Sequence, residues 1–188
     1  VLYKDNVATE QTSVIEVDTT NHSWSWRPTG LGATGLGDGS YKVRITVKDK
    51  ANNESTQYTG AVIIDTTKPT TTLSGTNLTD TAFASATELA AGSTYYASST
   101  YTISGVVSDT NWSTGATATY KVDGGTASTL SVDSTTKAWT LDSLSGSHSY
   151  EIILRDSAGN YNESTIVTVS YDATAPNASI DIPYADIT

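Results

Sequence analysis

The stretch VDSTTKAW at 132–139 repeats VDTTNHSW at 17–24, with the same first two residues and the same final tryptophan. Two further blocks recur in the same order: DKANNEST at 49–56 matches DSAGNYNEST at 156–165, and DTTKP at 65–69 matches DATAP at 172–176. Matched blocks in one order indicate an internal repeat. The sequence therefore predicts a tandem array of one structural unit.

The second copy of the repeat is divided into short strand-like segments by turn residues. The expected strands are 70–75, 101–107, 116–123, 126–132, 139–141, 150–154 and 164–171. Gly124-Gly125 is typical of a two-residue hairpin turn, and the long polar stretch 76–99 predicts an insertion with a short helix or hairpin. Seven such strands predict an all-β fold of tandem immunoglobulin-like β-sandwiches, each a seven-strand antiparallel Greek key. Trp24 and Trp139 occupy equivalent positions and are predicted to be core tryptophans.

The repeat blocks also predict the domain organisation. Residues 1–66 match the C-terminal part of a domain without its first two strands, 67–174 form a complete domain, and 175–188 match the first strand of a following one. This pattern favours a segment of a longer array. An alternative stays open, in which the tail of one subunit supplies a strand to the next.

Composition narrows the function classes. The net charge of −10 excludes a nucleic-acid partner, which selects for the opposite balance. No apolar run is long enough for membrane insertion. Cys is absent, which excludes thiol chemistry, and His22 and His148 lie in unrelated parts of the repeat. The chain is therefore predicted not to be an enzyme.

Acidic residues are predicted to gather at one pole of the second domain. Strands alternate in direction, so the loops after the second and sixth strands meet the entering linker. This arrangement brings together Asp65, Asp109, Asp156 and Asn160. Ca²⁺ binds six to eight oxygens from carboxylates, amides and carbonyls, so a calcium site is predicted. The alternative is that each Asp and Asn only shapes its own turn.

The motifs resemble those of a known family. DSAGN at 156–160 followed by DATAP at 172–176 resembles the ending of bacterial Ig-like domains, the modules repeated in giant surface adhesins, and ISGVVSD at 103–109 resembles their second strand. The resemblance implies secreted extender or adhesive modules that bind calcium at linkers. It implicates Asp65, Asp109, Asp156 and Asn160, with Asp49 and Asp172 at neighbouring junctions. The first copy departs from the pattern, because Asn52 stands where the second has Gly159.

These observations predict an extracellular or cell-surface role. The chain is expected to be a structural extender or stalk of a bacterial adhesin or fibre, stiffened by Ca²⁺ at the linkers between neighbouring Ig-like domains. One alternative is a self-assembling fibre or sheath subunit with inter-subunit strand complementation. Another is a carbohydrate-binding module that stacks a glycan on Trp112, Tyr95 and Tyr96.

Overall fold

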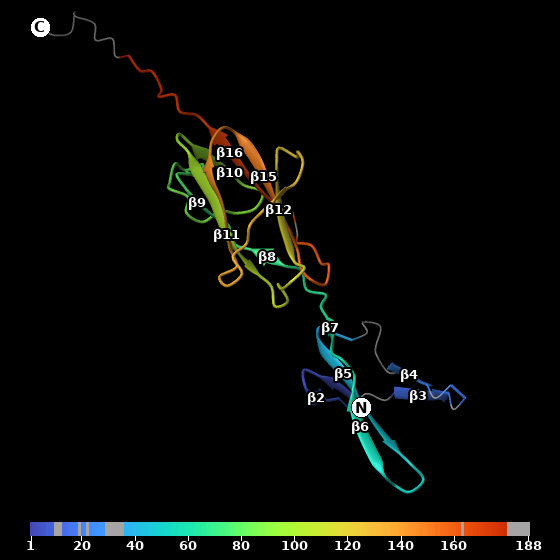
Figure 1. Ribbon diagram of the computed structural model, residues 1–188. Coiled ribbons are helices and arrows are strands. Elements are labelled where there is room, and N and C mark those ends of the chain that lie inside the picture. The colour runs from blue at the N-terminus through green and yellow to red at the C-terminus, as the bar shows by residue number, and fades with distance from the viewer. Residues whose placement is uncertain (10–12, 19, 22, 29–35, 163, 180–188) are drawn as a thin grey trace, which may run out of the picture. The chain divides into compact units, whose positions relative to one another are not determined.

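The computed structural model divides the chain into two compact units, unit 1 (Val1–Thr67) and unit 2 (Lys68–Thr188) (Figure 1). It describes all residues except 10–12, 19, 22, 29–35, 163 and 180–188. The described residues form strands, turns and loops, and none of them is in a helix. Accordingly, no described segment is a long apolar helix of the kind that crosses a membrane.

Three sequence predictions fall wholly or partly outside the described residues. They concern His22, residues 29–35 of the partial domain predicted in 1–66, and the final strand expected in 175–188. The described part of that last segment, residues 175–179, is not in a strand.

Unit 2 contains all seven predicted strands. The first of them is interrupted and forms two short strands, and the insertion adds one further strand, so that unit 2 has nine strands among its described residues. In chain order they are β8 (Thr70–Thr71), β9 (Ser74–Thr76), β10 (Thr94–Ala97), β11 (Tyr101–Ser108), β12 (Thr117–Val122), β13 (Ser128–Thr129), β14 (Ala138–Leu144), β15 (His148–Arg155) and β16 (Thr165–Tyr171). The predicted first strand is interrupted and forms both β8 and β9.

The strands of unit 2 form two sheets with the connectivity of an immunoglobulin-like sandwich. One sheet has the order β10-β16-β15-β12-β13, and the other has the order β14-β11-β8 with β9 also paired to β11. The chain passes from β11 to β12 in the opposite sheet, returns as β14 beside β11, and crosses again as β15 between β12 and β16 (Figure 1). This is a Greek-key path, and only the β10–β16 pairing is parallel among the described strand pairs of unit 2.

A tryptophan fills the space between the two sheets. The Trp139 side chain is 2% exposed, and its Nε1 donates a hydrogen bond to Thr71 Oγ1 at 2.8 Å. Gly105 lies directly opposite Trp139 in the β11–β14 register. A Cβ on residue 105 would lie 2.0 Å from the Thr72 carbonyl oxygen and 2.7 Å from the Trp139 ring. Glycine is therefore required where the first strand and the indole both approach β11.

The hairpin between β12 and β13 differs slightly from the prediction. Gly125 N–H donates to the Val122 carbonyl at 2.9 Å, so the two central turn residues are Asp123 and Gly124. Both have positive φ, 51° and 70°. This backbone twist matches that of the flanking strands, and Asp-Gly is a preferred pair for it. The sequence predicted Gly124 and Gly125 as the two turn residues, which is one position too far along the chain.

The insertion contributes to the core of unit 2 and forms a hairpin, not a helix. Thr79 pairs with Ser85 and, on its other side, with Tyr96 of β10. Leu78, Ala86 and Leu89 are buried in the hydrophobic core. Of the two predicted alternatives, the hairpin is the one formed, but the polar composition of 76–99 did not predict this packing, because the few apolar residues are spaced among Thr, Ser and Ala.

Unit 1 contains seven strands among its described residues. They are β1 (Leu2–Lys4), β2 (Val7–Ala8), β3 (Ser13–Asp18), β4 (Ser23–Pro28), β5 (Gly39–Lys48), β6 (Glu54–Tyr58) and β7 (Val62–Ile64). One sheet has the order β2-β1-β5-β6, with β7 paired to β5, and the described residues of β3 and β4 form a separate two-stranded sheet.

Equivalent residues of the two copies differ in burial. Val62 is 63% exposed, whereas its repeat equivalent Val169 is 1% exposed. Trp24 is 45% exposed, so the prediction that it is a core tryptophan like Trp139 is wrong for this structure. In unit 2 the equivalent residues Trp139 and Val169 belong to the hydrophobic core, whereas the described strands of unit 1 form a five-stranded sheet and a separate two-stranded sheet.

The close approach at Gly105 yields a stability prediction. Replacing Gly105 by Ala is expected to lower the free energy of unfolding of unit 2 by about 3 kcal/mol, because backbone and indole must both move. Gly60→Ala is the matched control, since a Cβ there meets nothing within 4 Å. Urea denaturation followed by circular dichroism measures both variants. Equal stability of the two would contradict this account of the core.

Candidate metal centre

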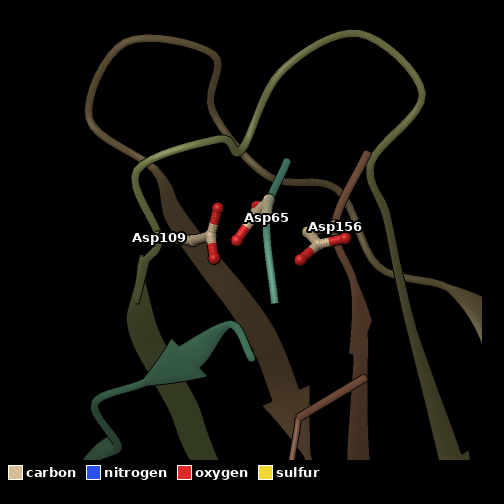
Figure 2. A group of neighbouring side chains, drawn as sticks. All are labelled: Asp65, Asp109 and Asp156. Atoms are coloured by element: carbon tan, nitrogen blue, oxygen red, sulfur yellow. The ribbon is translucent and has the colours of Figure 1, made fainter. Parts of the chain in front are cut away.

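Three carboxylates from three separate turns lie close together, and each directly follows a strand. Asp65 follows β7, Asp109 follows β11 and Asp156 follows β15. One carboxylate oxygen from each lies within 4.8 Å of those from the other two. Figure 2 shows the Asp65 side chain between those of Asp109 and Asp156. The structure thus brings together three of the six residues predicted as metal ligands.

Asp156 is fully buried and organises the turn that follows β15. Its Oδ1 accepts hydrogen bonds from the backbone N–H groups of Gly159 at 2.7 Å and Asn160 at 2.9 Å. Its Oδ2 accepts from the Asn160 side-chain amide at 2.7 Å. Gly159 has φ +102°, a conformation that favours glycine. The turn therefore holds the carboxylate in one orientation.

The hydrogen bonds determine the charge of Asp156. Burial by itself raises the pKa of this carboxyl group, but the side-chain hydrogen bond from Asn160 and backbone hydrogen bonds from Asn160, Gly159 and Ala158 outweigh it. The pKa of Asp156 is lowered below its ordinary value as a result. The buried side chain is therefore negatively charged at neutral pH.

Asp65 and Asp109 are each oriented by a hydrogen bond to the backbone of their own turn. Asp65 Oδ1 accepts from the Thr67 N–H at 3.0 Å, and Asp109 Oδ1 accepts from the Asn111 N–H at 2.7 Å. In both, a side chain caps the backbone two residues further on, which is a property of Asp in turns. The turn-forming and metal-binding interpretations of these residues are thus compatible, because the turn itself positions the carboxylate.

The other three predicted residues have different positions. Asn160 contacts the group through its hydrogen bond to Asp156. Asp49 in unit 1 forms the equivalent turn, accepting from the N–H groups of Ala51 and Asn53. Asp172 follows β16 and accepts from Thr174 N–H at 2.8 Å. Asp49 and Asp172 are not in the carboxylate group formed by the described residues, and their predicted role at other junctions stays a prediction.

Asp38 is a site-related residue that the sequence analysis missed. Its Oδ1 accepts hydrogen bonds from the Thr66 N–H and hydroxyl, and its Oδ2 accepts from the Thr67 hydroxyl at 2.6 Å. The pKa of Asp38 is lowered, chiefly by hydrogen bonds from the hydroxyl groups of Thr67 and Thr66. These contacts tie the segment that carries Asp65 to the rest of unit 1. Nothing in the local sequence of Asp38 signals a partner almost thirty residues away.

The carboxylate group has the chemistry of a hard-cation site. Like charges at this separation repel each other by about 3 kcal/mol per pair at an effective dielectric constant near 20. A divalent cation would remove this repulsion. Ca²⁺ accepts carboxylate, carbonyl and water oxygens in flexible geometry, whereas Mg²⁺ requires a near-ideal octahedron. The donor set, all oxygen and drawn from three turns, fits Ca²⁺ better.

The aromatic residues expected to stack on a glycan do not form one exposed platform. Tyr95 is 6% exposed, and its hydroxyl oxygen accepts a hydrogen bond from Ala90 N–H at 2.7 Å. Tyr96 points to the opposite face of β10 and is largely exposed. Trp112 is half-buried against the core of unit 2. Alternation along the strand separates the two tyrosines, which the sequence analysis treated as a pair.

Comparisons with known proteins leave the family open. No family model matches the chain, and no curated protein matches it. A similar solved structure is described as fibronectin(III)-like modules of Clostridium thermocellum CbhA. It is 14% identical, with 96% of this chain and 82% of that chain covered, at a TM-score of 0.35. A TM-score this low carries no argument, so the assignment of an immunoglobulin-like fold rests on the strand topology of unit 2.

The repeated turn allows a matched test of the buried carboxylate. Asp156→Ala is expected to lower the stability of unit 2 by about 1–3 kcal/mol, because buried backbone donors lose their acceptor. Asp49→Ala removes the same hydrogen bonds from an exposed turn and is expected to have a smaller effect. Calcium-free thermal denaturation measures both. A larger loss for Asp49→Ala would contradict the role assigned to burial.

The lowered pKa of Asp156 predicts a pH dependence. A carboxyl group with a lower pKa in the folded state stabilises the fold fully above its unfolded pKa of about 4. That stabilisation is lost as the pH falls through the folded pKa. The stability difference between the wild type and Asp156→Ala should therefore shrink below about pH 4. A difference that stays constant between pH 7 and pH 2 would show that the ionised form contributes nothing.

Proposed function

We propose that this chain is a structural extender segment of an extracellular, surface-attached protein, in which Ca²⁺ bound by Asp65, Asp109 and Asp156 fastens the connecting segment to the loops of unit 2. The observation that carries the proposal is the convergence of three carboxylates from separate turns within 4.8 Å. Their shared oxygen chemistry supports a calcium ion, with backbone carbonyls and water as further ligands.

The anchoring of the connecting segment supports a stiffening role. On one side, Thr66 and Thr67 are hydrogen-bonded to Asp38 of unit 1. On the other side, Pro69 is fully buried in unit 2. A cation on Asp65 would add a further attachment at the same segment. Bending at the segment would then require loss of metal ligands, so the ion is expected to make the joint less flexible.

Because the chain has no cysteine, a bound ion would supply stability that disulfides cannot. A β-sandwich outside the cell commonly gains stability from disulfides, which this chain cannot form. An ion that binds only the folded state stabilises it by mass action. The internal repeat and the acidic composition support the assignment to an array of Ig-like domains of the bacterial surface type. That finer assignment is part of the proposal.

Calcium binding is tested by thermal denaturation of the whole chain. Ca²⁺ at a hundred times its dissociation constant is expected to stabilise unit 2 by about 2.7 kcal/mol, and EDTA to abolish the gain. Asp109→Asn should reduce the gain while keeping an oxygen for the Asn111 N–H. Asp133→Asn, in an exposed turn of the same unit, is the control. Isothermal titration calorimetry with Ca²⁺ and Mg²⁺ gives the affinities directly.

Joint stiffness requires a separate measurement. Small-angle X-ray scattering with Ca²⁺ and with EDTA should show a broader distribution of dimensions in EDTA for the wild type, and no change for Asp109→Asn. An identical melting curve and identical scattering with and without calcium would remove calcium from the proposed function.

A further inference from the structure

Two cations and two tyrosines share one face of the five-stranded sheet of unit 1. Tyr3 of β1 lies directly opposite Lys42 of β5, and Tyr58 of β6 lies directly opposite Arg44 of β5. Lys42 and Arg44 are two residues apart, so their side chains point to the same face. The buried Leu2, next to Tyr3 in β1, points to the opposite face. Tyr3, Lys42, Arg44 and Tyr58 therefore form one surface group, the cation–tyrosine cluster.

The side chains of the cation–tyrosine cluster pack on each other. Arg44 Cζ lies 5.5 Å from the centre of the Tyr3 ring, and Lys42 Nζ lies 5.3 Å from the centre of the Tyr58 ring. The two rings meet edge to face with their centres 5.8 Å apart. These contacts restrain long side chains, while Tyr58 stays 53% exposed. The cluster is thus both accessible and partly ordered, which reduces the entropy lost when a ligand binds.

No carboxylate of the described residues forms an ion pair with Lys42 or Arg44. Lys42 Nζ donates a hydrogen bond to the neutral side chain of Asn6, to its Oδ1 at 2.7 Å. Arg44 Nε is buried and has no hydrogen-bond acceptor among the described residues. Two adjacent cations without an acid are unexpected in a chain that has 20 acidic and only 10 basic residues. Their combined charge favours an anion at this surface.

The acid closest in sequence to the cluster is turned away from it. Asp5 Oδ1 accepts a hydrogen bond from the Ser40 N–H at 2.8 Å. Asp5 Oδ2 lies 3.2 Å from the position that a Cβ on Gly39 would take. Gly39 precedes Tyr41 by two residues, so this position is on the face opposite to Lys42. Asp5 is therefore engaged with the backbone of β5 and does not neutralise the cluster.

The acid at the start of β6 is already paired, and hydroxyl groups separate it from the cluster. Glu54 Oε2 lies 3.3 Å from Lys48 Nζ. Between this pair and Arg44 lie Thr46 and Thr56, both exposed, with their hydroxyl oxygens 3.1 Å apart. Thr46 follows Arg44 by two residues and shares its face. The cationic surface thus continues into a pair of hydroxyl groups.

The second copy of the repeat lacks the cluster. Extending the repeat match back along β5 and β15 places Ser149 at the position of Lys42 and Glu151 at the position of Arg44. Glu151 is neutralised by Lys121, whose Nζ lies 3.2 Å from its Oε2. The shared fold therefore does not require two unpaired cations at these positions.

We infer that the cation–tyrosine cluster binds an acidic sugar, with the sugar carboxylate on Arg44 and Lys42. A guanidinium group binds a carboxylate through two parallel hydrogen bonds. The exposed ring of Tyr58 offers a flat apolar surface beside a hydroxyl group, which suits a sugar ring. Thr46 and Thr56 can exchange hydrogen bonds with sugar hydroxyl groups.

The charge of the whole chain limits the ligand to a short one. At a net charge of −10, a long polyanion that extended beyond the cluster would be repelled. One carboxylate on a hydroxylated ring therefore fits better than a nucleic acid or a strongly acidic peptide. The site lies within unit 1 and uses none of the proposed calcium ligands, so it is independent of the proposed function.

The test is an NMR titration of the isotopically labelled whole chain in EDTA with D-glucuronate. D-Glucose, which has a hydroxymethyl group in place of the carboxylate, is the neutral control. Glucuronate is expected to give saturable shifts confined to β1, β5 and β6, with a dissociation constant in the millimolar range, and glucose to give none. Added salt should weaken the binding, because the cluster is partly exposed.

Variants identify the groups that bind the carboxylate. Arg44→Gln and Tyr58→Ala should each weaken binding about tenfold or more, and Arg44→Lys should restore only part of it, because the fork of donors is lost. Lys121→Gln, on the equivalent face of unit 2, is the control and should bind like the wild type. The backbone signals of β5 report whether each variant keeps the fold of unit 1.

Several outcomes would overturn the inference. They are the absence of saturable shifts with glucuronate, equal binding of glucose, and wild-type binding by a folded Arg44→Gln variant. Tighter binding of a hexaglutamate peptide or of a short oligothymidine at the same residues would also overturn the assignment to a sugar. Loss of calcium binding would leave all these measurements unchanged, because they are made in EDTA.

Discussion

The packing of Trp139 against Gly105 is the constraint on which the structure of unit 2 depends. The indole fills the space between the sheets only because residue 105 has no side chain, and its N–H holds the first strand through Thr71. The first strand, β11 and β14 are therefore positioned together. With both sheets in place, the strand ends of β11 and β15 meet at one pole, and the carboxylates of Asp109 and Asp156 meet with them. The meeting of these two carboxylates is a consequence of the way the core is filled, and the proposed calcium site depends on it.

The Asp residues at this pole have two roles that reinforce each other. Each caps a backbone N–H, so each turn is ordered before any ion arrives. Electrostatic repulsion among the three is the penalty for placing them together. Local hydrogen bonds offset part of it at Asp156, whose pKa stays low despite complete burial. The proposed calcium site would therefore need no reorganisation of its loops on binding an ion.

The insertion hairpin of unit 2 combines buried apolar residues with one exposed aromatic residue. Three apolar residues of the insertion are buried in the core, whereas Phe83 at its tip is exposed in an unfavourable backbone conformation. Asp38 illustrates a different kind of contribution, because a single side chain attaches the segment that leads out of unit 1.

Much of the fold and part of the site follow from the sequence alone. The repeat, the alternation of Tyr101, Ile103 and Val107, and the turn motifs determine seven strands, because strand periodicity and turn chemistry are local properties. The pole that gathers Asp65, Asp109 and Asp156 also follows, since strand direction alternates. Tertiary structure alone decided the exposure of Trp24, the burial of Tyr95, the contact of Asp38 with Thr66, and the isolation of Phe83. Each of these depends on which surfaces meet across the sheets, and such long-range contacts leave no periodic trace in the sequence.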